Sequence, residues 1–167
     1  MKTVSILLFF SFTSYLLTGQ DIHDASINDA FENYKSSYLK VDRVGLLDYT
    51  HPHVIQVSGG KDYVIEDMTI DYNMYASSGL VITDLVLRQG SKVIQVGEDL
   101  QAMYPYERHL KKAKEELIES GFFLVVSKDK GETWFFTDMK KHDGESIKIF
   151  VPNYNDRFNI YLESTDK

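Results

Sequence analysis

The sequence predicts an α+β domain, with helices in the first half of the chain and strands in the second. Up to Ser77, apolar residues recur at the spacing of one helical face. From Leu80 onward, β-branched and aromatic residues form short runs that are separated by turn residues. Helices followed by strands in this order are typical of an α+β fold.

Length and composition allow one ordinary domain and exclude several classes of protein. The chain has 167 residues, of which 43% are hydrophobic and 26% are charged, so a packed core is expected. The formal net charge of −7 argues against nucleic acid as a partner. No cysteine is present, which excludes disulfides, a thiol nucleophile and cysteine-ligated zinc. Nucleotide and dinucleotide fingerprints are also missing, and we expect no cofactor.

Residues 1–19 have the pattern of a secretory signal peptide. Lys2 gives a short positive region, residues 4–12 are apolar, and Gly19 is a small residue at the expected cleavage point. The apolar stretch is shorter than the roughly 20 residues of a membrane span. We therefore expect an exported protein, periplasmic or secreted, whose mature domain covers 20–167 without a stable membrane anchor. Loss of Lys2 changes the formal charge from −7 to −8.

Three helical sections are predicted, at residues 26–39, 41–60 and 61–77. Ser26 stands at the capping position of the first section. The middle section is predicted to hold two short helices, because Asp42 can cap one and Pro52 suits the first turn of the other.

Strands are predicted at residues 80–88, 92–96, 100–106, 122–127, 133–138 and 158–164. Pro105 indicates that its strand lies at an edge or ends nearby, because proline donates no ladder hydrogen bond. Residues 109–121 are ambiguous, since their composition favours a helix whereas their place between two strands favours a long hairpin.

The stretch "SKDKGETW" matches the Asp-box spacing S-x-D-x-G-x-T-W, a motif that recurs in the blades of sialidase propellers. The chain is too short for several four-stranded blades. We interpret Ser127, Asp129, Gly131 and Trp134 as a structural turn, in which the polar side chains bond the backbone and the glycine supplies a positive φ.

The residues "FENYKSSYLKVDRVGLLDYTHPHVIQVSGGK" (31–61) and "FFLVVSKDKGETWFFTD" (122–138) resemble exported bacterial members of the nuclear transport factor 2-like superfamily, also called cystatin-like or SnoaL-like. The resemblance covers about residues 26–163. It implies N-terminal helices on a cone-shaped antiparallel sheet, with a pocket at its mouth. Some members of the superfamily are isomerases or dehydratases, and others only bind a ligand or partner, so the fold does not choose the function.

Two groups of residues are candidates for a site. His51 and His53 in "DYTHPH", and Asp138 at a strand end, could serve as acid–base residues, although a helix junction and a turn cap are the simpler interpretations. Two histidines are too few for a metal site, and we expect none. A pocket could be lined by tyrosines, namely Tyr49, Tyr72, Tyr75 and Tyr104.

The favoured interpretation is a non-enzymatic exported module that holds a small, partly apolar ligand in the cone, or a protein partner on the sheet. The alternative is a small lyase or isomerase that uses a His/Asp pair in the cone. A third hypothesis is a structural subunit that forms a homodimer through the sheet.

Overall fold

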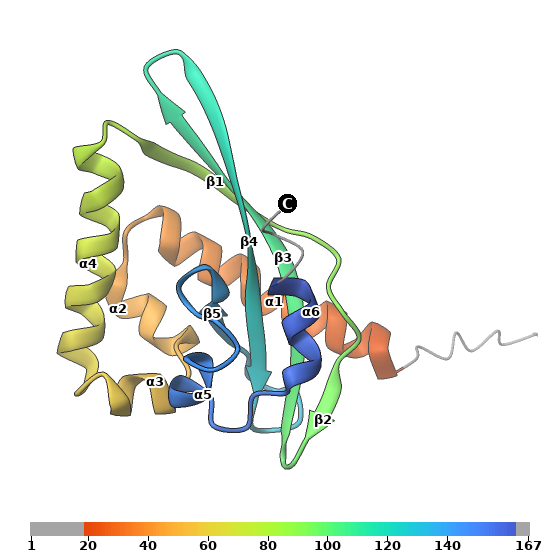
Figure 1. The fold of residues 1–167 in the computed structure, drawn as a ribbon. Coiled ribbons are helices and arrows are strands. Elements are labelled where there is room, and N and C mark those ends of the chain that lie inside the picture. The colour runs from red at the N-terminus through yellow and green to blue at the C-terminus, as the bar shows by residue number, and fades with distance from the viewer. Residues whose placement is uncertain (1–18, 163–167) are drawn as a thin grey trace, which may run out of the picture.

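The computed structural model describes residues 19–162, which form N-terminal helices followed by a strongly curled antiparallel half-barrel sheet (Figure 1). The α+β fold class predicted from the sequence is therefore confirmed. The helical half contains α1 (Gly19–Leu39), α2 (Arg43–Leu46), the 3-10 turn η1 (Leu47–Tyr49), α3 (Pro52–Val57) and α4 (Lys61–Ser77). The predicted signal peptide lies almost wholly outside the described residues and stays a prediction.

Helix α1 begins at Gly19 and not at Ser26, so the capping role predicted for Ser26 is wrong. The Ser26 hydroxyl donates to the carbonyl of His23 at 3.0 Å and accepts from the indole Nε1 of Trp134 at 2.9 Å. Ser26 therefore connects α1 to the strand half of the chain, a contact that helix-capping rules do not anticipate.

The short helices begin as the sequence predicts. The Asp42 carboxylate accepts from the backbone N–H of Gly45 at 3.0 Å, which caps α2. Pro52 occupies the first position of α3, where its missing N–H removes no helical hydrogen bond.

All strand pairs of the sheet are antiparallel, in the order β1-β3-β4-β5 with β2 also paired to β3. The strands are β1 (Val81–Leu87), β2 (Ile94–Val96), β3 (Asp99–Lys112), β4 (Glu115–Ser127) and β5 (Phe135–Asp138). Residues 109–121 form the projecting end of the β3–β4 hairpin (Figure 1), which resolves the ambiguity in favour of strands. Ladder pairing on this hairpin outweighs the helical preference of the segment.

Both positions predicted for Pro105, at an edge or near a strand end, are wrong, because β3 lies between β1 and β4 and continues to Lys112. The Pro105 carbonyl accepts from the N–H of Arg88 at 2.8 Å, just past the last residue of β1. The N–H and C=O of one strand residue face the same neighbouring strand. Proline has no N–H to donate, but this N–H would face the end of β1. No hydrogen bond between β3 and β4 is therefore lost.

The prediction of a last strand at residues 158–164 is wrong for residues 158–162, the part of it that the structure describes. This part of the chain contains η2 (Met139–Lys141), α5 (Ile147–Phe150), η3 (Asp156–Phe158) and α6 (Asn159–Leu162). Residues 158–162 therefore lie in η3 and α6 rather than in a strand.

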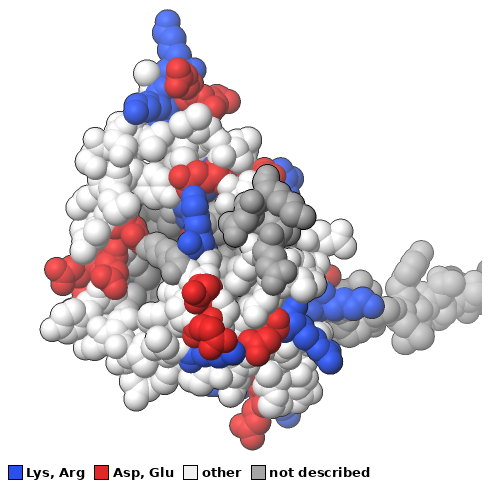
Figure 2. Space-filling view, in the orientation of Figure 1, with Lys and Arg blue, Asp and Glu red and all other residues white. Residues whose placement is uncertain are grey.

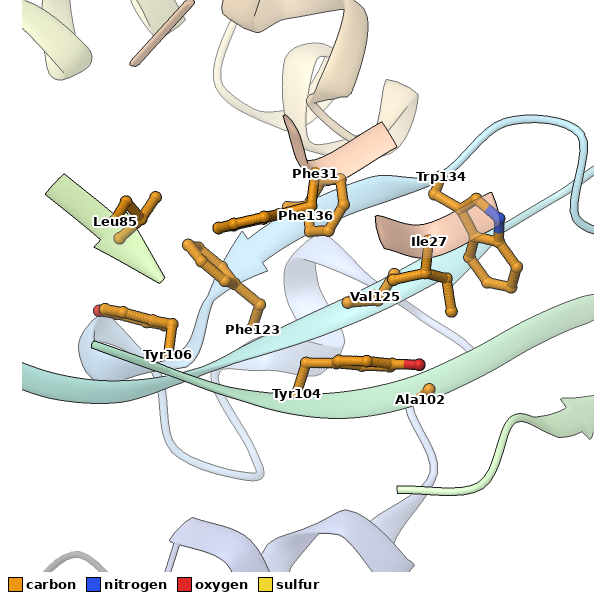
Figure 3. Close-up of a cluster of buried hydrophobic side chains, with 10 residues drawn as sticks. All are labelled: Ile27, Phe31, Leu85, Ala102, Tyr104, Tyr106, Phe123, Val125, Trp134 and Phe136. Atoms are coloured by element: carbon orange, nitrogen blue, oxygen red, sulfur yellow. The ribbon is translucent and has the colours of Figure 1, made fainter. Parts of the chain in front are cut away.

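The sheet carries a core cluster on each face. On one face, α1 contributes Ile27 and Phe31 to a cluster with inward residues of the strands and with Trp134 (Figure 3). On the other face, residues of the C-terminal segment pack on Met103, Leu124 and Val126. Consecutive residues of β3 and β4 alternate between the two clusters, as the pleat of a strand requires.

No helix within residues 19–162 combines the length and the hydropathy that a membrane span needs. On the face shown in Figure 2, acidic and basic side chains are interspersed and do not form a broad basic surface.

Candidate functional site

The Asp-box stretch forms a hydrogen-bonded turn between β4 and β5. The Ser127 hydroxyl donates to an Asp129 carboxylate oxygen at 2.8 Å and accepts from the N–H of Gly131 at 2.8 Å. Asp129 also accepts from the N–H of Thr133 at 2.9 Å, Gly131 has a φ of 97°, and Trp134 is buried. The polar groups and the glycine serve the turn itself, and Trp134 belongs to the core cluster under α1, so the functional site has to be sought elsewhere.

A large cavity, of about 830 Å³, lies between α4, the short helices α2 and α3, and the concave side of the sheet. Its walls are mainly aromatic and aliphatic, and they include Tyr34, Tyr38, Val64, Met68, Tyr72, Tyr75, Ile82 and Phe136. Helix α4 buries one residue, Val64, and so acts more as a wall of the cavity than as part of either core cluster.

Arg108 is a buried cation on the sheet side of this cavity, with 6% of its surface exposed. Its Nη1 donates to the Tyr75 hydroxyl at 2.6 Å and to Glu119 Oε2 at 3.0 Å. Its Nη2 donates to Asp138 Oδ2 at 3.2 Å. Two carboxylates therefore compensate one buried charge, as a cation removed from water requires.

Three tyrosine rings surround the Arg108 guanidinium at cation–π distance. The guanidinium carbon is 5.6 Å from the ring centre of Tyr38, 5.4 Å from that of Tyr75 and 5.3 Å from that of Tyr106. Burial raises the pKa of the Tyr75 and Tyr106 hydroxyls well above the usual range. Both hydroxyls therefore stay protonated and act as hydrogen-bond donors.

The two acids of the cluster have several donors each. Asp138 Oδ2 accepts from the Tyr106 hydroxyl at 2.8 Å as well as from Arg108, and Oδ1 accepts from the N–H of Lys140 at 2.9 Å. Glu119 Oε2 lies 3.1 Å from the Lys140 ammonium. Burial acts to raise the pKa of Glu119, but hydrogen bonds from Tyr75 and Lys140 outweigh it and hold this pKa below its usual value.

The predicted acid–base residues are not brought together. Asp138 lines the large cavity, whereas His51 and His53 line a separate, smaller one. His142 is the histidine that shares the large cavity with Asp138, and the sequence interpretation did not select it.

Two of the four predicted ligand-binding tyrosines line the large cavity, namely Tyr72 and Tyr75. Tyr104 is buried in the α1 cluster, where its hydroxyl donates to Asp24 at 2.5 Å. Tyr49 packs against the same cluster, with its ring centre 6.2 Å from that of Tyr34. The lining of neither cavity includes Tyr49 or Tyr104.

Sequence interpretation missed Arg108 and Glu119, the centre of the polar cluster. Arg108 stands two and four residues after Tyr106 and Tyr104, so alternation along a strand places all three on one face. Glu119 is the residue opposite Arg108 in the β3–β4 register. That pairing could have been proposed only if residues 109–121 had been read as a hairpin.

Val41 is a strained residue in the wall of the same cavity. Its φ is 60°, a conformation that β-branched residues rarely adopt.

Within residues 19–162, no group of three or more potential ligand side chains is placed to hold a metal ion. No protein-family model and no curated protein matches the chain, so the site has to be interpreted from its own geometry.

Proposed function

We propose that this chain is a non-enzymatic binding protein that holds a small, partly apolar ligand in the large cavity. The volume of about 830 Å³ falls in the range of small-molecule sites, which is about 300–1,000 Å³. Such sites combine apolar walls with a few convergent polar groups. The Arg108 cluster, set in aromatic and aliphatic walls, is the observation that carries the proposal.

The walls and the polar cluster indicate how a ligand would lie. Met68 and Tyr72 on α4 offer apolar surface, while Tyr75 and Arg108 lie toward the sheet. A ligand with an apolar body along α4 and a polar group near Arg108 would match both. We further propose membership of the nuclear transport factor 2-like superfamily, which the curled sheet and the cavity beside α4 support.

Binding without catalysis is the better proposal because Asp138 serves the polar cluster and has no histidine partner of the predicted pair beside it. Its two oxygens accept from Tyr106, Arg108 and the Lys140 backbone, and His51 and His53 line the other cavity. The lyase or isomerase alternative remains a proposal that rests on Asp138 and no longer on a pairing with His51 or His53.

We also propose export and self-association. The signal-peptide pattern supports export. A homodimer through the sheet would have to use area outside Met103, Leu124 and Val126, because the C-terminal segment covers these residues.

The proposal is tested by a matched pair of tryptophan substitutions on α4. Met68→Trp places an indole in the cavity, whereas Ile70→Trp, two residues along, adds the same group at a residue that is 52% exposed and outside the lining. The purified protein is screened against a library of small amphipathic molecules for thermal stabilisation. We expect hits that stabilise the wild type and Ile70→Trp but lose their effect on Met68→Trp.

Two outcomes would count against this function. A library that stabilises none of the three proteins would remove the case for a ligand. Hits that stabilise Met68→Trp as strongly as Ile70→Trp would place the ligand outside the cavity.

A further inference from the structure

Two arginines in the wall of the large cavity lie against tyrosines of α4. The guanidinium carbon of Arg43 is 5.7 Å from the ring centre of Tyr72, and that of Arg108 is 5.4 Å from the ring centre of Tyr75. All four residues line the cavity. The two arginines differ in how far the protein compensates their charge, and this difference indicates which ligands the cavity would bind.

The side chain of Arg43 lies on the inner face of α2. Leu46, three residues later, is buried and lines the cavity as well. Residues three apart lie on one face of a helix. Val44, by contrast, is 68% exposed and is not part of the lining. The half-buried Arg43 side chain therefore runs toward the cavity and Tyr72 rather than outward into solvent.

No acid compensates the charge of Arg43. Of the three Lys and Arg residues in the lining, Arg108 pairs with Glu119 and Asp138, and Lys140 pairs with Glu119. The guanidinium of Arg43 has neither a hydrogen bond nor an ion pair within residues 19–162. Its Nε is shielded, whereas Nη1 and Nη2 retain accessible surface. The accessible end of this side chain thus carries donors without an acceptor.

The contact with Tyr72 leaves these donors available to a ligand. A cation–π contact uses the face of the guanidinium, whereas its N–H groups point outward in the plane. Two N–H groups, one on Nη1 and one on Nη2, match the two oxygens of a carboxylate. This end-on contact requires no access to the shielded Nε of Arg43.

Two acids of α4, Asp67 and Asp71, also line the cavity and would repel an anion. Asp67 is exposed, so water and salt screen its charge. Neither acid lies within ion-pair distance of Arg43. Because the Coulomb energy falls with distance, we expect direct contact with the guanidinium to outweigh this repulsion.

We propose that the ligand of the large cavity is an amphipathic monocarboxylate, and that its carboxylate oxygens accept from Nη1 and Nη2 of Arg43. The apolar body of this ligand lies against Met68. Arg108 does not bind the carboxylate, because Glu119 and Asp138 already compensate that guanidinium and would repel a third negative charge. This inference rests on the proposed function, since it names the class of ligand for the same cavity.

The test uses three probes with the same chain and different head groups, namely octanoate, 1-octanol and octylamine. Each is titrated at pH 7 into wild-type protein with ¹³C-labelled methionine methyl groups, and the Met68 signal is followed by NMR. We expect a saturable shift with octanoate. 1-Octanol and the octylammonium ion should bind at least about tenfold more weakly, because neither forms a charge-assisted hydrogen bond with Arg43.

Variants of Arg43 test whether the carboxylate binds at this residue. Arg43→Gln removes the charge, and we expect it to bind octanoate at least about tenfold more weakly and 1-octanol as the wild type does. Arg43→Lys retains a charge but loses the two-bond geometry, and its affinity for octanoate should be intermediate. Arg157→Gln makes the first change at an exposed arginine outside the lining and should leave both affinities unaltered.

Several results would overturn this inference and leave the proposed function standing. These are equal or tighter binding of 1-octanol or octylammonium by the wild type, and equal losses of octanoate and 1-octanol binding in Arg43→Gln. If Arg43→Gln does not fold, the wild type and Arg43→Lys decide the matter. No saturable shift with any of the three probes would also overturn the inference, and the library screen then judges the proposed function separately.

Discussion

At the scale of single residues, Arg108 shows how one buried charge fixes the positions of its neighbours. Its guanidinium joins a tyrosine on α4 to an acid on β4 and another at the end of β5. Removing one partner of a buried ion cluster leaves the other charges without compensation. Arg108 is therefore expected to contribute to stability as well as to the polar wall of the cavity.

Replacing Arg108 by methionine tests this contribution. We expect Arg108→Met to lower the free energy of unfolding by about 3–5 kcal/mol, because Glu119 and Asp138 lose a buried counter-charge. Arg88→Met is the matched control, since Arg88 forms a two-bond pair with Glu107 at 3.0 and 2.6 Å but its side chain is 55% exposed. The control should lose much less, because an exposed ion pair contributes little to stability. Urea unfolding at neutral pH measures both, and equal losses would show that Arg108 is not specially stabilising.

At the scale of elements, the C-terminal end of α1 departs from the usual preference for glycine after a helix. The N–H of Asp42 bonds the carbonyl of Ser37 at 2.9 Å, and the N–H of Val41 bonds that of Tyr38 at 3.2 Å. This is a Schellman motif with Val41 at the position that glycine usually occupies. Since Val41 lines the large cavity, the strain lies where a ligand would bind.

Glycine at this position should relieve the strain. We expect Val41→Gly to raise the free energy of unfolding by about 1 kcal/mol, because a left-handed conformation disfavours a β-branched side chain. A thermal melt should show an increase of about 3 °C. Val44→Gly makes the same change at an exposed position inside α2 and should be destabilising by about 0.5–1 kcal/mol. Changes of the same sign in both variants would argue against strain at Val41.

At the same scale, predictions that depend on neighbouring residues were correct, whereas those that depend on pairing with distant residues were ambiguous or wrong. The hairpin at residues 122–138 was predictable because Ser127, Asp129 and Gly131 act within a few residues of one another. The upper part of the β3–β4 hairpin was ambiguous, because its strand state depends on pairing with residues distant in sequence. Pro105 was misplaced for the same reason, since only the end of β1 makes a proline acceptable there.

At the scale of the whole molecule, the buried apolar residues are distributed unevenly. Strands β3 and β4 lie between two core clusters, one under α1 (Figure 3) and one under the C-terminal segment. Helix α4 buries Val64 alone and stands over the large cavity. Its connection to the sheet includes the contacts of Tyr75 with Arg108 and Glu119.

Hydrogen exchange should reveal this difference. We expect backbone amides in the interior of α4 to exchange by local opening, at least about tenfold faster than those of the β3–β4 ladder. The measurement is amide exchange followed by NMR at neutral pH. Tyr75→Phe, which removes the hydroxyl contacts, should accelerate α4 further and leave the ladder unchanged. Uniform exchange across α4 and the ladder would contradict this account.

The sequence by itself determined the fold class, the order of the helices and most strands, and the turn between β4 and β5. Those features follow from spacing and from contacts within a few residues, which a linear pattern records. Only the tertiary structure decided that Arg108, Glu119 and Asp138 meet, and that His51 lies apart from them. Such groupings depend on strand register and on packing between distant segments, and several registers are compatible with one hydrophobic pattern.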